Sequence, residues 1–233
     1  MPELPEVQTV VTTLRPRLLG RRLVAARLAR ADVVCPPGTD LAALVEGRRV
    51  ADLARRGKRI VVTLDDGCRF YVHLGMTGQL TVADAAVAAL PHTHLEVELS
   101  PSDAGAAADG TSAGGSAAAT TREVLRFRDA RRFGGIWWLG RDGQADRGMG
   151  PEPLTLRPAA LLRRLGRTGR NIKTALLDQA LVAGLGNIYV DESLFLARLH
   201  PLRPACELTP AEVGRLSRAI KVTLRKAIRH RGS

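Results

Sequence analysis

The sequence has few aromatic residues and no long apolar run. Phe, Trp and Tyr make up 3% of the 233 residues, which is too few for a broad surface on which bases stack, as in single-strand binders. No stretch is long and apolar enough to cross a bilayer, and the N-terminus lacks the basic-then-apolar pattern of a signal peptide. We therefore expect an intracellular protein with no membrane partner.

Cysteine is also scarce. Cys35, Cys68 and Cys206 lie far apart, with neither the spacing of metal ligands nor that of a disulfide framework. We expect free thiols in a reducing compartment and no metal bound to these residues.

Basic residues are in large excess. The chain has 35 Lys and Arg against 23 Asp and Glu, which gives a formal net charge of +12 and a pI near 11.0. Such an excess attracts polyanions, of which nucleic acid is the commonest. A solvated basic surface or a ribosome-associated protein would show the same excess, so charge alone leaves the partner open.

The apolar pattern predicts a β-rich domain over residues 1–148. Val7, Val11 and Leu14 recur at helical spacing, which indicates a leading helix that ends near Gly20. Residues 100–121 contain small and polar residues without an apolar period, and we expect a flexible loop there. Strands are expected at 23–29, 50–54, 60–64, 70–74, 95–99, 124–127 and 136–139.

The pattern becomes helical after Gly148. Helices are expected around 161–165, 172–177 and 187–199. The last helix has a clear start, because Thr209 can cap it, Pro210 fits its first position and Glu212 completes a capping box. We expect an α+β fold, with an all-helical second domain over residues 149–233.

The N-terminus offers a nucleophile. Removal of Met1 before Pro2 would expose a secondary amine, and α-amino groups have a pKa far below that of lysine. Addition of this amine to a sugar C1′ gives an iminium, which acidifies the C2′ proton and permits elimination of phosphate. Glu3 could protonate the ring oxygen. Read in isolation, Pro2, Pro5 and the glutamates are better explained as the start of a helix, where acidic residues complement the dipole.

Six motifs follow one another along the chain and cover nearly all of it apart from the loop 100–121. They are Pro2-Glu3-Leu4-Pro5-Glu6-Val7, Arg56-Gly57-Lys58, His73-Leu74-Gly75-Met76-Thr77-Gly78, Asp129-Ala130-Arg131-Arg132-Phe133-Gly134, Gly150-Pro151-Glu152-Pro153-Leu154 and Gly184-Leu185-Gly186-Asn187-Ile188-Tyr189. One motif alone is weak, but an ordered series is specific. Together these motifs resemble the formamidopyrimidine-DNA glycosylase family.

The resemblance implies an N-terminal β-sandwich followed by a helix–two-turn–helix domain, and it implies roles for individual residues. Pro2 would form a Schiff base, Glu3 would donate a proton and Lys58 would assist β-elimination. Without the resemblance, Lys58 is as well explained as a surface lysine at a strand edge, and the histidines as structural residues. The residues implied to contact DNA are His73, His92, Arg131, Arg132, Thr168, Arg170, Lys173 and Asn187.

A nucleotide flipped out of a duplex leaves a gap in the base stack. By resemblance, Met76, Arg131 and Phe133 would fill it, with Phe133 as an apolar wedge, Met76 as a flexible filler and Arg131 facing the orphaned cytosine. The alternative is that Phe133 and Met76 belong to the core and that the arginines contact only phosphate.

The turn 184–187 separates two helical stretches. Its glycines let backbone N–H groups approach closely, and a helix N-terminus favours a phosphate. The resemblance makes this turn part of a clamp on the duplex backbone, whereas the alternative is a helical hairpin with glycine caps.

Family members usually continue into a β-hairpin zinc finger with four cysteines. The chain ends at Ser233, where that segment would begin. We therefore expect no zinc site in this chain. We also expect the chain to be either a fragment or a natural truncation with impaired activity. The missing finger would supply an arginine for δ-elimination.

The sequence therefore predicts a bifunctional DNA glycosylase and abasic-site lyase of base excision repair. It would excise oxidised purines, 8-oxoguanine and formamidopyrimidines, from damaged double-stranded DNA by a proline Schiff base and β/δ-elimination. We expect a cytoplasmic, nucleoid-associated bacterial monomer without a small-molecule cofactor. One alternative is an endonuclease VIII-like enzyme for oxidised pyrimidines, against which Leu4 and the motif 131–133 argue. The other is a DNA-binding module without catalysis.

Overall fold

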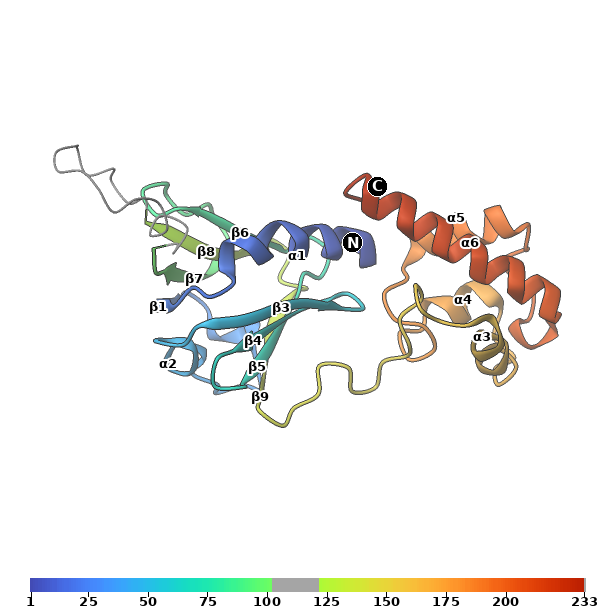
Figure 1. Cartoon of the computed structure of the whole chain (residues 1–233), viewed down its shortest axis with the longest axis horizontal. Coiled ribbons are helices and arrows are strands. Elements are labelled where there is room, and N and C mark those ends of the chain that lie inside the picture. The colour runs from blue at the N-terminus through green and yellow to red at the C-terminus, as the bar shows by residue number, and fades with distance from the viewer. Residues whose placement is uncertain (102–121, 233) are drawn as a thin grey trace, which may run out of the picture. The chain divides into compact units, whose positions relative to one another are not determined.

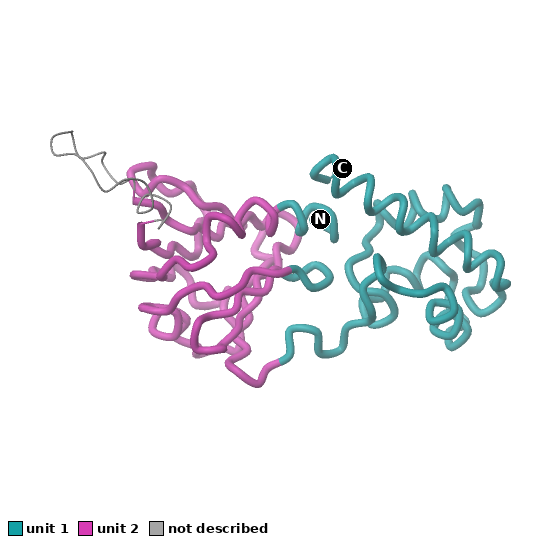
Figure 2. The backbone as a smooth tube through the Cα atoms, in the orientation of Figure 1, with its two compact units in different colours: residues 1–9, 55–59, 144–233 teal, residues 10–54, 60–143 magenta. Residues whose placement is uncertain are grey.

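The computed structural model describes residues 1–101 and 122–232 (Figure 1). Contacts along the chain divide it into two compact units (Figure 2), one of residues 1–9, 55–59 and 144–233 and the other of residues 10–54 and 60–143. The loop predicted at 100–121 lies, from residue 102 onward, outside the described residues.

The unit of residues 10–54 and 60–143 is a β-sandwich. One sheet has the strand order β1-β7-β8-β6 and the other β2-β9-β5-β4-β3. Neighbouring pairs such as β7 and β8 are antiparallel, whereas β2 and β9 are parallel. The strands are β1 (Leu23–Leu28), β2 (Val34–Cys35), β3 (Val50–Arg56), β4 (Arg59–Leu64), β5 (Arg69–His73), β6 (Gln79–Asp84), β7 (Thr93–Leu99), β8 (Glu123–Arg128) and β9 (Gly135–Gly140).

Apolar side chains from both sheets meet between them. Leu80 and Leu125 of one sheet and Val62 and Val72 of the other line the same small apolar cavity. Phe127 of β8 is completely buried. The alternation of buried and exposed residues along the strands thus builds one core, as expected of two facing sheets.

The leading helix is α1 (Leu4–Leu18), as predicted. Its buried residues follow the 3–4 spacing of one helix face, and Gly20 adopts a φ of +77° just after its end, which favours glycine. The buried residues are Leu4, Val7, Val11, Leu14 and Leu18.

The helical part of the other unit contains α3 (Pro158–Leu165), α4 (Ile172–Leu177), α5 (Asn187–Ala197) and α6 (Pro210–Arg229). The predicted capping box of α6 is confirmed, because Glu212 N–H donates to the Thr209 hydroxyl and the Glu212 carboxylate accepts from Thr209 N–H. The prediction of a helix to residue 199 was too long, because Arg198 adopts a left-handed φ of 53° and ends α5.

Several short elements were not predicted. Strand β6 has apolar residues at only two positions, Leu80 and Val82, which are nevertheless buried on the sheet that β6 shares with β8. The five-residue helix α2 (Leu41–Val45) begins at Asp40, whose carboxylate caps it. A 3-10 turn at Ala31–Val33 precedes β2, and another spans Ala205–Glu207. Each helix in the described residues is too short or too polar to span a membrane.

Candidate active site

The Glu3 carboxylate caps a helix that is distant in sequence. Glu3 is 2% exposed. Its Oε2 accepts a hydrogen bond of 2.6 Å from Gly186 N–H, and its Oε1 accepts one of 2.9 Å from Ile188 N–H. The first turn of a helix has N–H groups without helical partners, and α5 begins after Gly186, which has no side chain to accept from them. Glu3 satisfies these groups in its place.

Burial changes the acid–base behaviour of two predicted catalytic residues. Burial raises the pKa of Glu3 despite opposition from the Ile188 N–H, from Lys58 and from the Gly186 N–H. Burial also lowers the pKa of Lys58, which is 7% exposed, against the opposing charges of Glu3 and Glu6. Both shifts favour the neutral forms, a protonated carboxyl that can give a proton and an unprotonated amine that can accept one.

The backbone next to Pro2 is fixed in place. Glu3 N–H donates to Glu6 Oε2 at 2.9 Å, and Leu4 N–H donates to the Gly184 carbonyl at 3.0 Å. The Tyr189 hydroxyl donates to the other oxygen of Glu6. Pro2 itself is half-buried. Glu3, the next residue, is held by Glu6 through its backbone N–H and at the N-terminus of α5 through its side-chain carboxylate.

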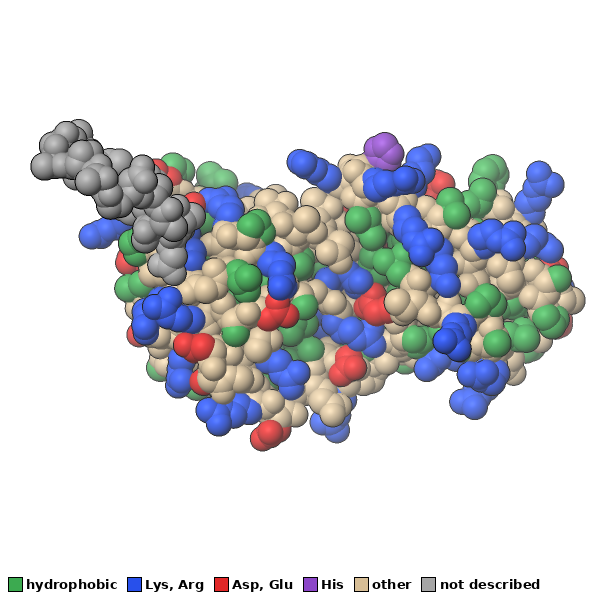
Figure 3. Space-filling view, viewed as in Figure 1, with side chains coloured by type: hydrophobic (Ala, Val, Ile, Leu, Met, Phe, Trp, Pro, Cys, Tyr) green, Lys and Arg blue, Asp and Glu red, His purple; other side chains and the backbone are tan. Residues whose placement is uncertain are grey.

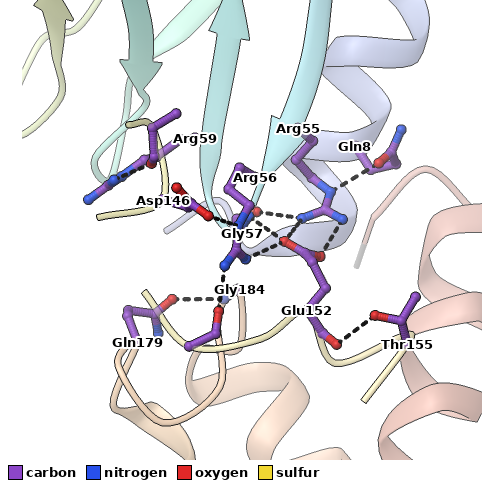
Figure 4. Close-up of polar contacts among 12 residues, drawn as sticks. Gln8, Arg55, Arg56, Gly57, Arg59, Asp146, Glu152, Thr155, Gln179 and Gly184 are labelled. Atoms are coloured by element: carbon purple, nitrogen blue, oxygen red, sulfur yellow. Dashed lines mark hydrogen bonds and ion pairs between the residues drawn. The ribbon is translucent and has the colours of Figure 1, made fainter. Parts of the chain in front are cut away.

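Lys58 lies on the turn between β3 and β4, and Glu152 holds this turn (Figure 4). The Glu152 carboxylate accepts from Gly57 N–H at 2.7 Å. The guanidinium groups of Arg55 and Arg56 converge on the same carboxylate, at 2.6 Å and 3.0 Å. Hydrogen bonds from these groups outweigh the effect of burial and keep the pKa of Glu152 below its ordinary value, so a charged carboxylate ties together three consecutive residues that precede Lys58.

The turn before α5 is held by Gln179. Its Oε1 accepts from Gly184 N–H at 2.8 Å (Figure 4), and its Nε2 donates to the Leu185 carbonyl at 2.8 Å. Gly184 adopts a φ of +88° and packs so closely on Leu4 that a Cβ would lie 2.8 Å from Leu4 Cδ1. The turn 184–187 therefore requires glycine where it meets the N-terminal segment.

The predicted void-filling residues are exposed. Phe133 is 57% exposed and Met76 is 44% exposed, so the interpretation of these two as core residues is wrong. The Arg131 guanidinium carbon lies 5.0 Å from the centroid of the Phe133 ring, within the range of a cation–π contact. All three belong to the β-sandwich unit.

The three histidines near the sandwich loops differ in their surroundings. His73 is half-buried, and its Nδ1 accepts from Gly75 N–H at 3.1 Å. His92 is exposed and adopts a φ of 68°. His94, for which no role was predicted, is buried with its Nε2 2.8 Å from the Asp129 carbonyl oxygen.

The remaining predicted DNA contacts lie at the surface, several in ion pairs. Arg132 pairs with Asp32 at 3.0 Å, Arg170 with Asp178 at 2.8 Å and Lys173 with Asp191 at 2.8 Å. Thr168 accepts from Arg170 Nε at 3.1 Å, and Asn187 is exposed in the first turn of α5. Exposed ion pairs contribute little free energy in water, so these cations can exchange carboxylates for phosphates.

Basic side chains cover much of the surface of both units on the face drawn in Figure 3, with fewer acidic ones among them. Across residues 1–101 and 122–232, no group of three or more His, Cys, Asp or Glu side chains is arranged to hold a metal ion. Cys35 and Cys68 are half-buried, and Cys206 is exposed.

Two family models match the chain. Residues 1–136 match the formamidopyrimidine-DNA glycosylase N-terminal domain, and residues 149–233 match the H2TH domain of the same family. Among curated relatives, formamidopyrimidine-DNA glycosylases of Chloroflexus aggregans and Acidiphilium cryptum are 42% and 41% identical. Each alignment covers 100% of this chain, with 79% of the first relative and 78% of the second.

Solved structures of Lactococcus lactis formamidopyrimidine-DNA glycosylase share this fold. One, non-covalently bound to DNA containing an AP site, superimposes with a TM-score of 0.85 at 29% identity, over 99% of this chain and 83% of that one. Another, in complex with DNA containing FAPY-dG, also has a TM-score of 0.85 at 29% identity, over 99% and 82% of the two chains. The helical hairpin that contains the turn 184–187 is thus part of a helix–two-turn–helix domain, and the chain belongs to the formamidopyrimidine-DNA glycosylase family.

Proposed function

We propose that this protein is a bifunctional DNA glycosylase and abasic-site lyase that removes oxidised purines from duplex DNA. The observation that carries the proposal is the buried Glu3 carboxyl, which is next to Pro2 in the chain and whose pKa burial raises. A carboxyl group that can donate a proton, beside a secondary amine, is the pair that opening of a deoxyribose ring requires. Membership of the family supports the same chemistry.

After removal of Met1, the Pro2 nitrogen would attack C1′ of the damaged nucleotide. A bond forms between this nitrogen and C1′, the bond from C1′ to the base breaks with its electron pair leaving on the base, and the N–H proton of Pro2 passes to the departing base. Glu3 would protonate the ring oxygen as the ring opens, which leaves an iminium between Pro2 and C1′. Loss of a C2′ proton then expels the 3′ phosphate, a second elimination expels the 5′ phosphate, and hydrolysis of the iminium by water would release the unsaturated sugar from Pro2.

Lys58 would serve the elimination. Its lowered pKa, caused by burial, gives a larger fraction of free amine at neutral pH than an exposed lysine has. A free amine can accept the C2′ proton or exchange protons with the departing groups. Glu152 holds the turn that bears Lys58. The backbone at Lys58 therefore need not become ordered during the reaction.

Side chains of both units would contact the DNA. Met76, Arg131 and Phe133 would enter the gap left by the flipped nucleotide, with Arg131 donating to the orphaned cytosine. The exposure of Phe133 and Met76 supports this role. The phosphates would be held by His73, His92, Arg132, Thr168, Arg170, Lys173 and Asn187. We also propose that the protein acts as a monomer in the bacterial cytoplasm, in association with the nucleoid, and without a small-molecule cofactor.

Borohydride trapping on duplex DNA with one abasic site tests the proposal. The purified chain should give a covalent adduct, and peptide mapping should place it on Pro2. A matched preparation with residues added before Met1 keeps every other group but lacks a free Pro2 nitrogen, and it should give no adduct. Duplex binding without any adduct would leave the DNA-binding module as the function.

The substrate class is tested with duplexes that carry one lesion. Duplexes with 8-oxoguanine or a formamidopyrimidine opposite cytosine should be cleaved faster than duplexes with an oxidised pyrimidine. The reverse order would replace the proposed substrate with that of an endonuclease VIII-like enzyme, while the Schiff-base chemistry would stand.

A further inference from the structure

Asp129 is a completely buried carboxylate at the start of the loop that bears Arg131 and Phe133. Its Oδ1 accepts from the Thr77 hydroxyl at 2.5 Å and from Arg131 N–H at 3.2 Å. Its Oδ2 accepts from Gly134 N–H at 2.7 Å. The Asp129 side chain therefore accepts hydrogen bonds from N–H groups at both ends of its own loop. It also accepts one from Thr77, which follows Met76 in the neighbouring loop.

The backbone of Asp129 adds a third segment. Its N–H donates to the His92 carbonyl at 3.1 Å, and its carbonyl oxygen lies 2.8 Å from His94 Nε2. The strand end at 92–94 is thus fixed to the same residue. All of these groups belong to the β-sandwich unit.

The two loops lie in backbone contact where Asp129 joins them. A Cβ on Gly75 would lie 2.4 Å from Gly134 N, and a Cβ on Gly134 would lie 2.5 Å from the His73 carbonyl oxygen. Arg132 adopts a φ of 58°, which is unfavourable for a side-chain-bearing residue. A tight arrangement with a left-handed arginine persists only where surrounding contacts hold it.

Asp129 stays ionised in this setting. Burial acts to raise the pKa of Asp129, but hydrogen bonds from Thr77 and from the N–H groups of Gly134, Arg131 and Arg132 outweigh it and hold the pKa below its usual range. A charged acceptor strengthens each of these hydrogen bonds relative to a neutral one.

We propose that Asp129 is a positioning residue, which with Thr77 fixes the loops bearing Met76, Arg131 and Phe133 before DNA binds. The inference rests on the proposed function, because it assigns those three residues to the gap in the base stack. Exposed side chains on untethered loops would lose conformational entropy on entering the duplex. The hydrogen bonds of Asp129 to both loops, which we call the tether, lower this entropy loss in the step in which the nucleotide leaves the base stack.

Two substitutions test the tether. In Asp129→Asn the amide faces a donor in either orientation, Gly134 N–H in one and Arg131 N–H in the other. Displacement of a functional group by about 1 Å can cost about 100-fold, and we expect a fall of about 10- to 100-fold in single-turnover excision of 8-oxoguanine. Trapping on a preformed abasic site should fall much less. Thr77→Val should act in the same direction, whereas Thr77→Ser, which keeps the hydroxyl, should stay near wild type.

A matched control is Asp142→Asn, which removes an exposed carboxylate from the same unit and should change neither rate. Thermal denaturation shows whether each variant is folded. If Asp129→Asn does not fold, the Thr77→Val and Thr77→Ser pair decides. Equal loss of excision and trapping in folded variants, or excision by Thr77→Val at the wild-type rate, would overturn the inference.

A readout independent of catalysis separates this inference from the proposed function. In a duplex that carries a stable abasic analogue, 2-aminopurine beside the analogue brightens when a wedge unstacks it. Wild-type protein should give this signal even if no borohydride adduct forms, and Asp129→Asn should weaken it while binding the duplex. An absent adduct alone would refute the proposed chemistry, and an unchanged signal in Asp129→Asn would refute the tether.

Discussion

Replacement of Gly186 with alanine should displace the Glu3 carboxylate without removing any functional group. A Cβ at position 186 would lie 2.4 Å from Glu3 Cδ and 2.5 Å from Glu3 Oε1, whereas ordinary contacts begin at 3.4 Å. The φ of Gly186 is −133°, which any residue can adopt, so this contact is the main obstacle. Glu3 cannot move away freely, because its own N–H and that of Leu4 are hydrogen-bonded.

The required displacement is about 1 Å, the difference between 3.4 Å and 2.4 Å. A displacement of this size costs about 100-fold in rate, or about 2.7 kcal/mol in activation free energy. The hydrogen bonds of Glu3 to the α5 N-terminus should also weaken, at a cost of about 1–3 kcal/mol in the free energy of unfolding. Single-turnover excision of 8-oxoguanine from a duplex measures the first effect, and urea denaturation measures the second.

The control is Gly214→Ala in α6, where a new Cβ meets nothing within 4 Å. Alanine is favoured over glycine in a helix by about 0.5–1 kcal/mol, so this variant should be slightly more stable and fully active. If folded Gly186→Ala excised 8-oxoguanine at the wild-type rate, the position of the Glu3 carboxylate would have no bearing on the chemistry, and the assignment of Glu3 as proton donor would fall.

Three further predictions concern other parts of the chain. Phe133→Ala should impair excision of an oxidised purine more than trapping on a preformed abasic site, because an abasic nucleotide costs less to extrude; equal losses would refute the wedge. Glu152→Gln should loosen the turn that bears Lys58 and slow strand cleavage about tenfold relative to adduct formation, measured on the same abasic duplex, and an unchanged ratio would contradict this. Hydrogen bonds from Thr209 N–H and Arg203 lower the pKa of Glu212 from 4.5 to about 2. The stability that Glu212 adds should therefore be present above pH 4.5 and be lost toward pH 2. Glu212→Gln should flatten that part of the acid-unfolding curve, and a curve of unchanged shape would refute it.

Local sequence signals predicted the helices better than the strands. Helix α4 (Ile172–Leu177) was predicted with its observed bounds, because its apolar residues lie within a few positions of one another. Strand β6 was missed, since Leu80 and Val82 give only a weak alternation until pairing with β8 buries them. Strand pairing joins residues that are distant in sequence, and no short window contains that information.

The candidate site shows the same limit more sharply. Read in isolation from the other motifs, Glu3 and Glu6 are better explained as acidic residues that complement the dipole of α1. In the structure, Glu3 instead accepts from the N-terminus of α5, and Glu6 accepts from Tyr189 on that helix. Motif resemblance brought Glu3 forward as a candidate, but only the fold gives the physical reason for its altered pKa.

Asp129 and Glu152 were both within motifs that the sequence brought forward, yet neither received a role. Each is a carboxylate that accepts backbone N–H groups and side-chain donors next to a proposed functional residue. A sequence shows that such residues are acidic, but some of their partners come from loops more than 50 residues away, as for Thr77 and Asp129, whose separation is 52 residues. The groups that react can therefore be inferred from motifs, whereas the groups that hold them in place become visible only when the chain is folded.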